Sequence, residues 1–536
     1  MAAEGRAWGG GKSADRVALR LEALEPRLLL SGNVTAGVIG GKLVVTGDDF
    51  TNDIIVSQTG ADFTLTSGGD ITTINLGPGP ETFYNVTGDL QFKMAGGDDV
   101  LELDSVTTPA NVKVDGGAGN NSLTIDPSSI GGSLTVKNGA GSDSFSLTDS
   151  YVSGSVSISN GSGGSTTVVG LTTIGGNLIV KNNDGSDSLL MAADGVSGSL
   201  KIGNGNGASA TVIGAVDIGL DLGIKNGVGA DSISLAGVGV SGNVRIENGS
   251  GGSSVVIDPT EIFGNLTIKN GDGADLITLD TVGVSGTLAV NNGSGGSDVQ
   301  IVDTSSIGGD VQVKNGAGDD AFTLSDSGVS GSVSINNGAG DSEMTIDPST
   351  IGGNLAITNS LGGSSSIDIG ELTLGGGLTI ANGAGVSDID VGSSTIGGDL
   401  LITTGSSGDS LLFVGLEVSG QTVISTGAGA DDITEDDSTF TGAFWVDSGS
   451  EGDLVQLDVN TTGVGPTAFG SSLTVHAGTG DDTVWAGNPY VTALTYIDVS
   501  GPALFDGGLG NDTLYDDGSN TYSLGETRIS FETINT

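Results

Sequence analysis

The sequence predicts an all-β protein, a single-stranded parallel β-helix or β-solenoid with about 19 coils of about 22 residues each. Three observations support this fold class. Asparagine residues recur at one fixed spacing through the centre of the chain, and a row of branched apolar residues keeps the same spacing. Between these rows, short segments alternate apolar side chains with small or polar ones. Together they indicate strands that stack coil upon coil.

The two rows are independent of each other, which makes a chance period improbable. The first consists of Asn138, Asn160, Asn182, Asn204, Asn226, Asn248, Asn270 and Asn292, followed after one-residue insertions by Asn315, Asn337, Asn359 and Asn382. The second consists of Val152, Ile174, Val196, Ile218, Val240, Ile262, Val284, Ile307, Val329, Ile351, Leu374, Ile396 and Val418.

Within a coil the apolar residues have period two, as in Leu134 and Val136 before an Asn-Gly pair and Phe145 and Leu147 after it. This alternation is typical of strands with one buried face, and the Gly- and Asn-rich breaks are typical of turns. Each coil therefore has two clear strands and a short third apolar step. One coil cannot bury these residues alone, whereas stacked coils form continuous apolar columns. At a spacing of about 4.8 Å per coil, the stack is roughly 90 Å long.

The Asn row has a physical reason. Asparagine tolerates left-handed backbone angles, and its amide can bond to the same residue one coil away. The row resembles the asparagine ladder of right-handed parallel β-helices such as pectate lyases. That resemblance concerns architecture, and it implies right-handed coils.

The two ends of the chain differ from its centre. We expect a terminal segment at 1–32 that is disordered or forms a short helix, capping strands at 33–92, the regular solenoid at 93–454 and irregular coils at 455–536. The string Leu24-Glu-Pro-Arg-Leu-Leu-Leu-Ser31 resembles the LEPR-XLL segment at the N-termini of large repetitive bacterial proteins, especially those of planctomycetes. The resemblance implies a sorting or export role outside the fold, and hence a secreted or cell-surface protein.

The composition restricts the partners. The chain has no cysteine, so disulfides and thiol chemistry are excluded, and 16 basic residues face 65 acidic ones, giving a net charge of −49. Such a chain repels nucleic acid and anionic membranes. We expect a monomer whose natural small partners are cations. No apolar run is long enough to predict a transmembrane segment.

The glycine-rich turns point to one cation. Gly507-Gly-Leu-Gly-Asn-Asp-Thr-Leu-Tyr515 resembles the calcium-binding RTX (hemolysin-type) nonapeptide GGxGxDxUx, and the turn that holds Asp482 lacks only its first Gly. Here, however, one such turn occurs per coil, whereas RTX repeats place two in each coil. From Asp409 onward each coil supplies one Asp at this position. The resemblance implies a Ca²⁺ site whose ligands are Asp431, Asp453, Asp482, Asp506 and Asp512.

In the central coils this Asp occurs only in every second coil, together with a Lys, in segments that start at Lys137, Lys181, Lys225, Lys269 and Lys314. We interpret this alternation as a charge pattern that disfavours self-association. The Asp residues of these coils are expected to serve the turn itself rather than an ion.

Catalytic groups are sparse. His476 is the single histidine, and Arg245 is the single arginine between Arg27 and Arg528. No nucleophile, base and stabiliser can be assembled from them. The sequence therefore predicts a non-enzymatic secreted or cell-surface solenoid with a structural or adhesive role, whose partners are surface glycans or other cell-envelope components and calcium ions. Two alternatives stay open: an RTX-like protein whose C-terminal coils are ordered by Ca²⁺, and, more remotely, a polysaccharide lyase or hydrolase that uses paired carboxylates.

Overall fold

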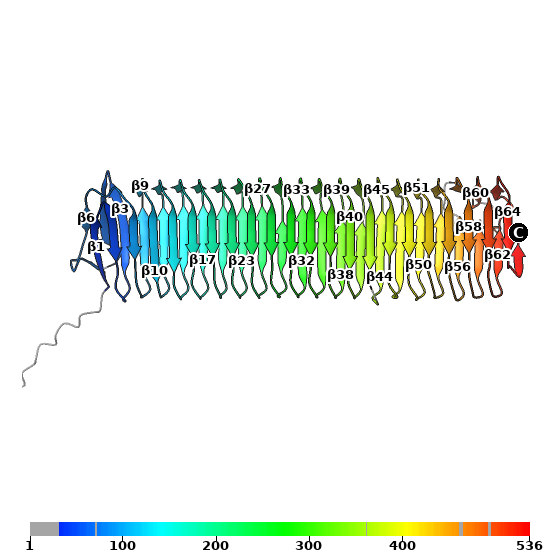
Figure 1. The fold of residues 1–536 in the computed structure, drawn as a ribbon, viewed down its shortest axis with the longest axis horizontal. Helices are drawn as coiled ribbons and strands as arrows, with labels where there is room; N and C mark the ends of the chain where they lie inside the picture. The colour runs from blue at the N-terminus through cyan, green and yellow to red at the C-terminus, as the bar shows by residue number, and fades with distance from the viewer. Residues whose placement is uncertain (1–31, 70–71, 361, 460–464, 491–494) are drawn as a thin grey trace, which may run out of the picture.

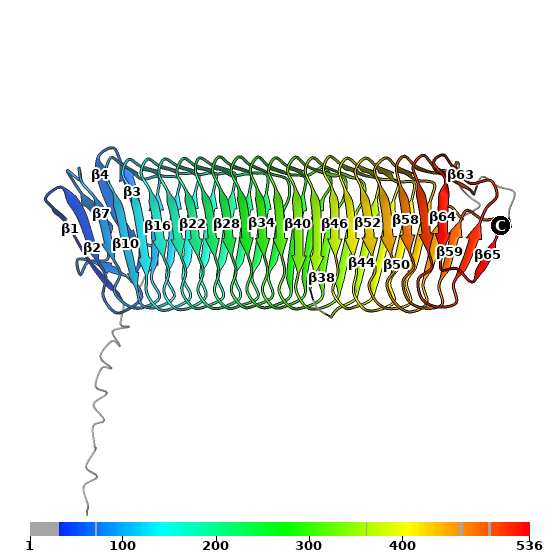
Figure 2. The ribbon, with the colours of Figure 1, turned by 45° about the vertical axis from the view of Figure 1, so that its right-hand side comes forward.

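The computed structural model describes residues 32–69, 72–360, 362–459, 465–490 and 495–536. These residues form one straight rod of stacked coils, with the first coils at one end and residue 536 at the other (Figure 1 and Figure 2). The LEPR-XLL-like string and its predicted sorting role lie outside the described residues. The described segments form no helix, and so none that could cross a membrane.

Each regular coil contributes one strand to each of three parallel sheets. A representative coil consists of β13 (Leu134–Asn138), β14 (Ser144–Thr148) and β15 (Tyr151–Val152). The next coil, with β16 (Val156–Ser159), β17 (Thr166–Gly170) and β18 (Thr173–Ile174), pairs with it in parallel. We call these the first, second and third sheets. The predicted parallel β-solenoid with coils of about 22 residues is confirmed.

The core lies between the three sheets. Alternate residues of each long strand point inward, so that Leu134 and Val136 of the first sheet and Phe145 and Leu147 of the second are buried. The same positions are buried in the coils above and below, which produces continuous columns of Val, Ile, Leu and Phe. Burial of these columns is the main favourable contribution to the fold.

The predicted asparagine contacts are present. From Asn138 to Asn359, each side-chain Nδ2 donates to the Oδ1 of the next Asn at 2.7–3.0 Å. Beyond Asn382 the row changes chemistry: the hydroxyls of Thr404, Thr426 and Ser448 donate to main-chain carbonyls of the next coil at 2.9–3.0 Å.

The turns bring backbones of successive coils into close approach. A Cβ atom built on Gly161 would lie 1.3 Å from the carbonyl oxygen of Gly139 in the preceding coil. No side chain fits there, which explains why glycine recurs at this position.

The first coils are built from antiparallel hairpins. β1 (Asn33–Ile39) pairs with β2 (Lys42–Thr46), and β3 (Asp53–Thr59) pairs with β4 (Asp62–Ser67). β2 and β3 then pair in parallel with β7 (Leu90–Lys93) and β8 (Val100–Asp104), which start the regular stack.

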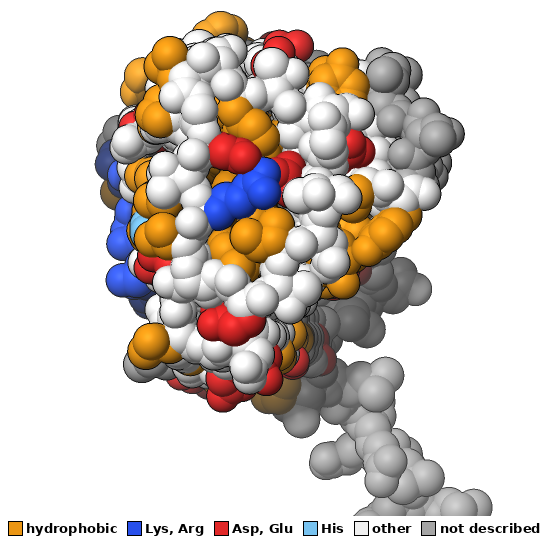
Figure 3. All heavy atoms as spheres, turned by 90° about the vertical axis from the view of Figure 1, so that its right-hand side faces the viewer, with side chains coloured by type: hydrophobic (Ala, Val, Ile, Leu, Met, Phe, Trp, Pro, Cys, Tyr) orange, Lys and Arg blue, Asp and Glu red, His pale blue; other side chains and the backbone are white. Residues whose placement is uncertain are grey.

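The last strands, β64 (Glu526–Ile529) and β65 (Thr533–Asn535), have a described partner on one side only. Their side chains are largely exposed, and hydrophobic groups, including Leu509 and Leu524, are exposed near this end. Figure 3 shows this end face, where hydrophobic side chains lie between acidic and basic ones.

Candidate functional site

A row of buried aspartates lies where the glycine-rich turn enters the second sheet. Asp431, Asp453, Asp482 and Asp512 occupy the same position in four successive coils, and each is at most 3% exposed. One carboxylate oxygen of each has a clear role. Oδ1 accepts the backbone N–H of the equivalent residue one coil earlier, at 2.8 Å for Asp431, 3.0 Å for Asp453 and 2.9 Å for both Asp482 and Asp512. We call these residues, with Asp409, the aspartate row.

The second oxygen of each carboxylate has no such role. Oδ2 is buried in all five residues and accepts no hydrogen bond from any described residue. Two nearby hydroxyls, those of Thr426 and Ser448, donate instead to main-chain carbonyls of the next coil. Buried carboxylate oxygens without donors are costly unless a proton or a cation neutralises them.

The pKa values reflect this surrounding. Burial, with a contribution from the neighbouring Asp431 and Asp482 carboxylates, raises the pKa of Asp453 to about 7. Burial, with a contribution from Asp512, raises the pKa of Asp482 to about 6. The pKa values of Asp431 and Asp512 are raised for the same leading reason. At neutral pH the row therefore holds charges close together in a poorly solvated place.

The central coils keep their buried carboxylates farther apart, although the Oδ2 atoms of these aspartates are also buried and accept no hydrogen bond from the described residues. There Asp187 and Asp275 accept both the backbone N–H and the hydroxyl of a serine one coil earlier, Ser165 and Ser253, with hydroxyl distances of 2.5 and 2.6 Å. Because serine and aspartate alternate, the charges lie two coils, or about 10 Å, apart rather than about 5 Å.

This geometry explains why the aspartates of the central coils occur in every second coil, and it corrects our interpretation of that alternation. The alternating aspartates are not surface charges that disfavour association. Asp187 and its equivalents are buried acceptors for the turn, whereas the accompanying Lys181 is exposed.

Asp506 does not belong to the row. It ends β61 (Ala503–Asp506) in the first sheet, where its Oδ1 accepts the N–H of Gly508 at 3.1 Å and its Oδ2 lies 3.6 Å from His476 Nδ1. The structure thus places four of the five predicted ligands in one row, one in each successive coil, and the fifth at the entrance of the turn.

Sequence reasoning missed Glu532. Its Oε2 accepts the N–H of Asp512 at 2.7 Å, as the next aspartate would in a further coil. Its place one residue before the last strand, β65, is the signal that could have revealed it.

The residues of the row fit a hard divalent cation. Calcium takes six to eight oxygen ligands from carboxylates and backbone carbonyls. The row offers unpartnered carboxylate oxygens in consecutive coils, beside turns with many carbonyls. A cation there would supply the positive charge that the described surroundings of these oxygens lack.

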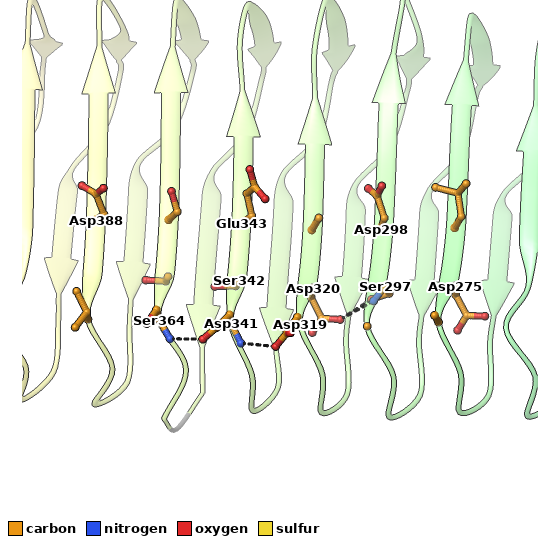
Figure 4. A pocket seen from close by; sticks show the side chains of 17 residues that line it. Asp275, Ser297, Asp298, Asp319, Asp320, Asp341, Ser342, Glu343, Ser364 and Asp388 are labelled. Carbon is orange, nitrogen blue, oxygen red and sulfur yellow. Dashed lines mark hydrogen bonds between the residues drawn. The ribbon is translucent and has the colours of Figure 1, made fainter.

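A second feature is an acidic groove of about 820 Å³ on the outer face of the second sheet. Its walls carry outward-pointing Asp298, Glu343 and Asp388 from every second strand of this sheet, and Leu276 and Val386 lie exposed in it (Figure 4). Along its lower edge in that view, the N–H of Ser364 donates to Asp341 at 2.8 Å, and the N–H of Asp341 donates to Asp319 at 3.1 Å. The groove attracts cationic groups and repels anionic polymers.

A third feature is an aromatic cluster in the C-terminal coils. The rings of Trp485 and Tyr515 stack with centroids 4.1 Å apart, and exposed Tyr490 packs edge-on against both. Such surfaces present a flat apolar body with polar tips to a ligand.

Comparison with known proteins leaves these features as the basis for function. No model of a known protein family matches the chain, and no curated protein matches it.

Proposed function

We propose that the protein is a non-enzymatic, secreted or cell-surface solenoid that serves as a rigid structural or adhesive rod. The observation that carries this proposal is the uniformity of the coil stack. From β13 to β55 (Phe444–Asp447), successive strands of the first sheet pair in parallel without a break. The residues of each of these coils extend one stack, rather than forming long loops that converge on one point.

An adhesive role draws support from the surface. The aromatic cluster around Trp485 has the flat, partly apolar face on which sugar rings can pack. The acidic groove at Asp298 and Glu343 suits cationic groups of the cell envelope. Surface glycans and other envelope components are therefore the partners that we propose.

A second candidate function, calcium binding, is favoured by the buried Oδ2 atoms of the aspartate row. Asp431, Asp453, Asp482 and Asp512 would hold the ions. The bound cation would neutralise like charges between adjacent coils, and so would order the C-terminal part of the rod after export to a calcium-rich medium.

The structural and calcium proposals have separate tests. Fractionation of the native cells should find the protein in the envelope or the medium, whereas a wholly cytoplasmic protein would contradict a surface role. Calorimetric titration of the full chain with calcium at low salt should release or absorb heat. The absence of any binding heat would remove the calcium function and leave the structural one.

A further inference from the structure

A carboxylate interrupts an apolar column in the second sheet. Glu435 of β53 (Asp432–Asp436) lies in the column between Phe413, one coil before, and Leu457, one coil after. All three side chains are fully buried, with 0% exposure. Charged side chains are almost never placed there unless they are paired.

Three further carboxylates lie at the corner where the second sheet leads into the third. One oxygen each from Asp436, Asp437 and Asp458 lies within 4.8 Å of the others. Asp436 and Asp458 are buried, and Asp437 is partly exposed, which leaves a route from solvent. Asp437 and Asp458 have left-handed φ values of 55° and 56°, which turn the chain at the corner.

Thr467, from the start of β57 (Thr467–Phe469), joins this group to Glu435. Its hydroxyl donates to Glu435 Oε1 at 3.1 Å, and its backbone N–H donates to Asp458 Oδ2 at 3.0 Å. The two remaining oxygens, Glu435 Oε2 and Asp458 Oδ1, are buried and accept no hydrogen bond from the residues that the structure describes.

No basic side chain among the described residues pairs with Glu435 or Asp458. Burial raises the pKa of Glu435 well above its ordinary value, and the charges of Asp458 and Asp436 raise it further. Burial, followed by the contact with the Asp436 carboxyl, raises the pKa of Asp458 to about 7. The group must be neutralised by protons or by a cation.

We propose that Asp436, Asp437 and Asp458, with Glu435 beside them, form a second site for a hard divalent cation such as calcium, at the corner between the second and third sheets. All of its donors are carboxylate oxygens, which favours hard cations such as calcium over thiophilic or imidazole-binding metals. The site is separate from the aspartate row, because it lies after the second-sheet strands whereas the row lies before them. The ion ties together the two coils that contain β53 and β56 (Leu454–Leu457).

The test uses hydrogen exchange of the full-length protein, read on peptides that cover residues 432–440 and 454–459, in EDTA and in millimolar calcium. Calcium should slow exchange of these peptides in the wild type. Asp458→Asn and Glu435→Leu should weaken the calcium dependence roughly tenfold or more. In Glu435→Leu the new side chain is apolar, like Phe413 and Leu457 in the same buried column. We therefore expect this variant to keep the fold even where Asp458→Asn does not.

A control variant separates this site from general surface charge. Asp368→Asn, an exposed acid of the second sheet, should leave the calcium protection of these peptides intact. The proposal is overturned if calcium protects the corner equally in the wild type and in Glu435→Leu. It is also overturned if calcium has no effect while Glu435→Leu slows exchange in EDTA, because protons alone would then neutralise the group.

Discussion

Exchanging Asp453 for serine would give the aspartate row the alternating pattern of the central coils. In the folded protein Asp453 lies between Asp431 and Asp482, about one coil spacing from each. Two charges about 5 Å apart repel by about 3 kcal/mol at an effective dielectric constant of about 20. The exchange removes this repulsion on both sides, although proton uptake already relieves part of it.

Two local terms modify this gain. The new hydroxyl can donate to Asp482 Oδ1, as the Ser165 hydroxyl donates to Asp187, which contributes about 1 kcal/mol. The N–H of Asp431 loses its acceptor, which costs about 1–3 kcal/mol. We therefore expect Asp453→Ser to stabilise the cation-free C-terminal coils by about 2 kcal/mol at about pH 8, and to weaken calcium binding by the aspartate row.

The assay must be local, because stacked coils need not unfold in one step. Hydrogen exchange of the segment 432–457 in EDTA should slow about 30-fold in Asp453→Ser, which corresponds to about 2 kcal/mol. Asp388→Ser, the same change on the exposed outer face of the second sheet, should leave exchange unaltered. Faster exchange in Asp453→Ser than in the wild type, both in EDTA, would refute the reasoning.

Three other predictions follow from the rows and turns. Asn226→Ala removes the hydrogen bonds that Asn226 makes with Asn204 and Asn248, at 2.7 and 2.8 Å. It should destabilise the central coils by about 2–4 kcal/mol, which would be measured as faster amide exchange there. Unchanged exchange would contradict a stabilising role for the asparagine ladder. Gly161→Ala should disrupt its coil because the new Cβ atom would meet the Gly139 carbonyl. Gly203→Ala should be tolerated, since a Cβ atom there has no heavy atom within 4 Å. Equal thermal melts of the two variants would count against the close approach of the backbones. The folded pKa values of Asp453 and Asp482 are raised to about 7 and about 6, so the folded state binds protons more tightly than the unfolded one. Cation-free C-terminal coils should therefore be more stable at about pH 5 than at about pH 8, and the stability should be lost as the pH rises through about 6–7. A flat pH profile of amide exchange would contradict this.

The sequence predicted most of the fold because the period fixes the register. Once Asn138 and Asn160 are placed one above the other, the positions of Leu134 over Val156 and of Phe145 over Thr167 follow. The antiparallel hairpins before β7 were not foreseen, since residues 33–92 have no repeat against which to align them.

The candidate site was predicted in part for the same reason. Asp431 to Asp512 follow the repeat, so their shared row could be read from their spacing, whereas Asp506 was included because it precedes the turn in sequence. Its strand position aligns it with His476 instead. Glu435 could have been found from its spacing to Phe413 and Leu457. Its contact with Thr467 could not, because the longer connection before Thr467 breaks the period.

The most direct test of the account is a thermal melt of the full chain followed by circular dichroism, at neutral pH, first in EDTA and then in millimolar calcium. The account predicts a β-rich spectrum in both buffers, since the apolar columns and the asparagine ladder hold the central coils together without an ion. It also predicts that calcium raises the temperature of the step that unfolds the C-terminal coils. Identical melts in the two buffers would contradict the role of the buried carboxylates, and a disordered spectrum in EDTA would contradict a rod that folds by itself.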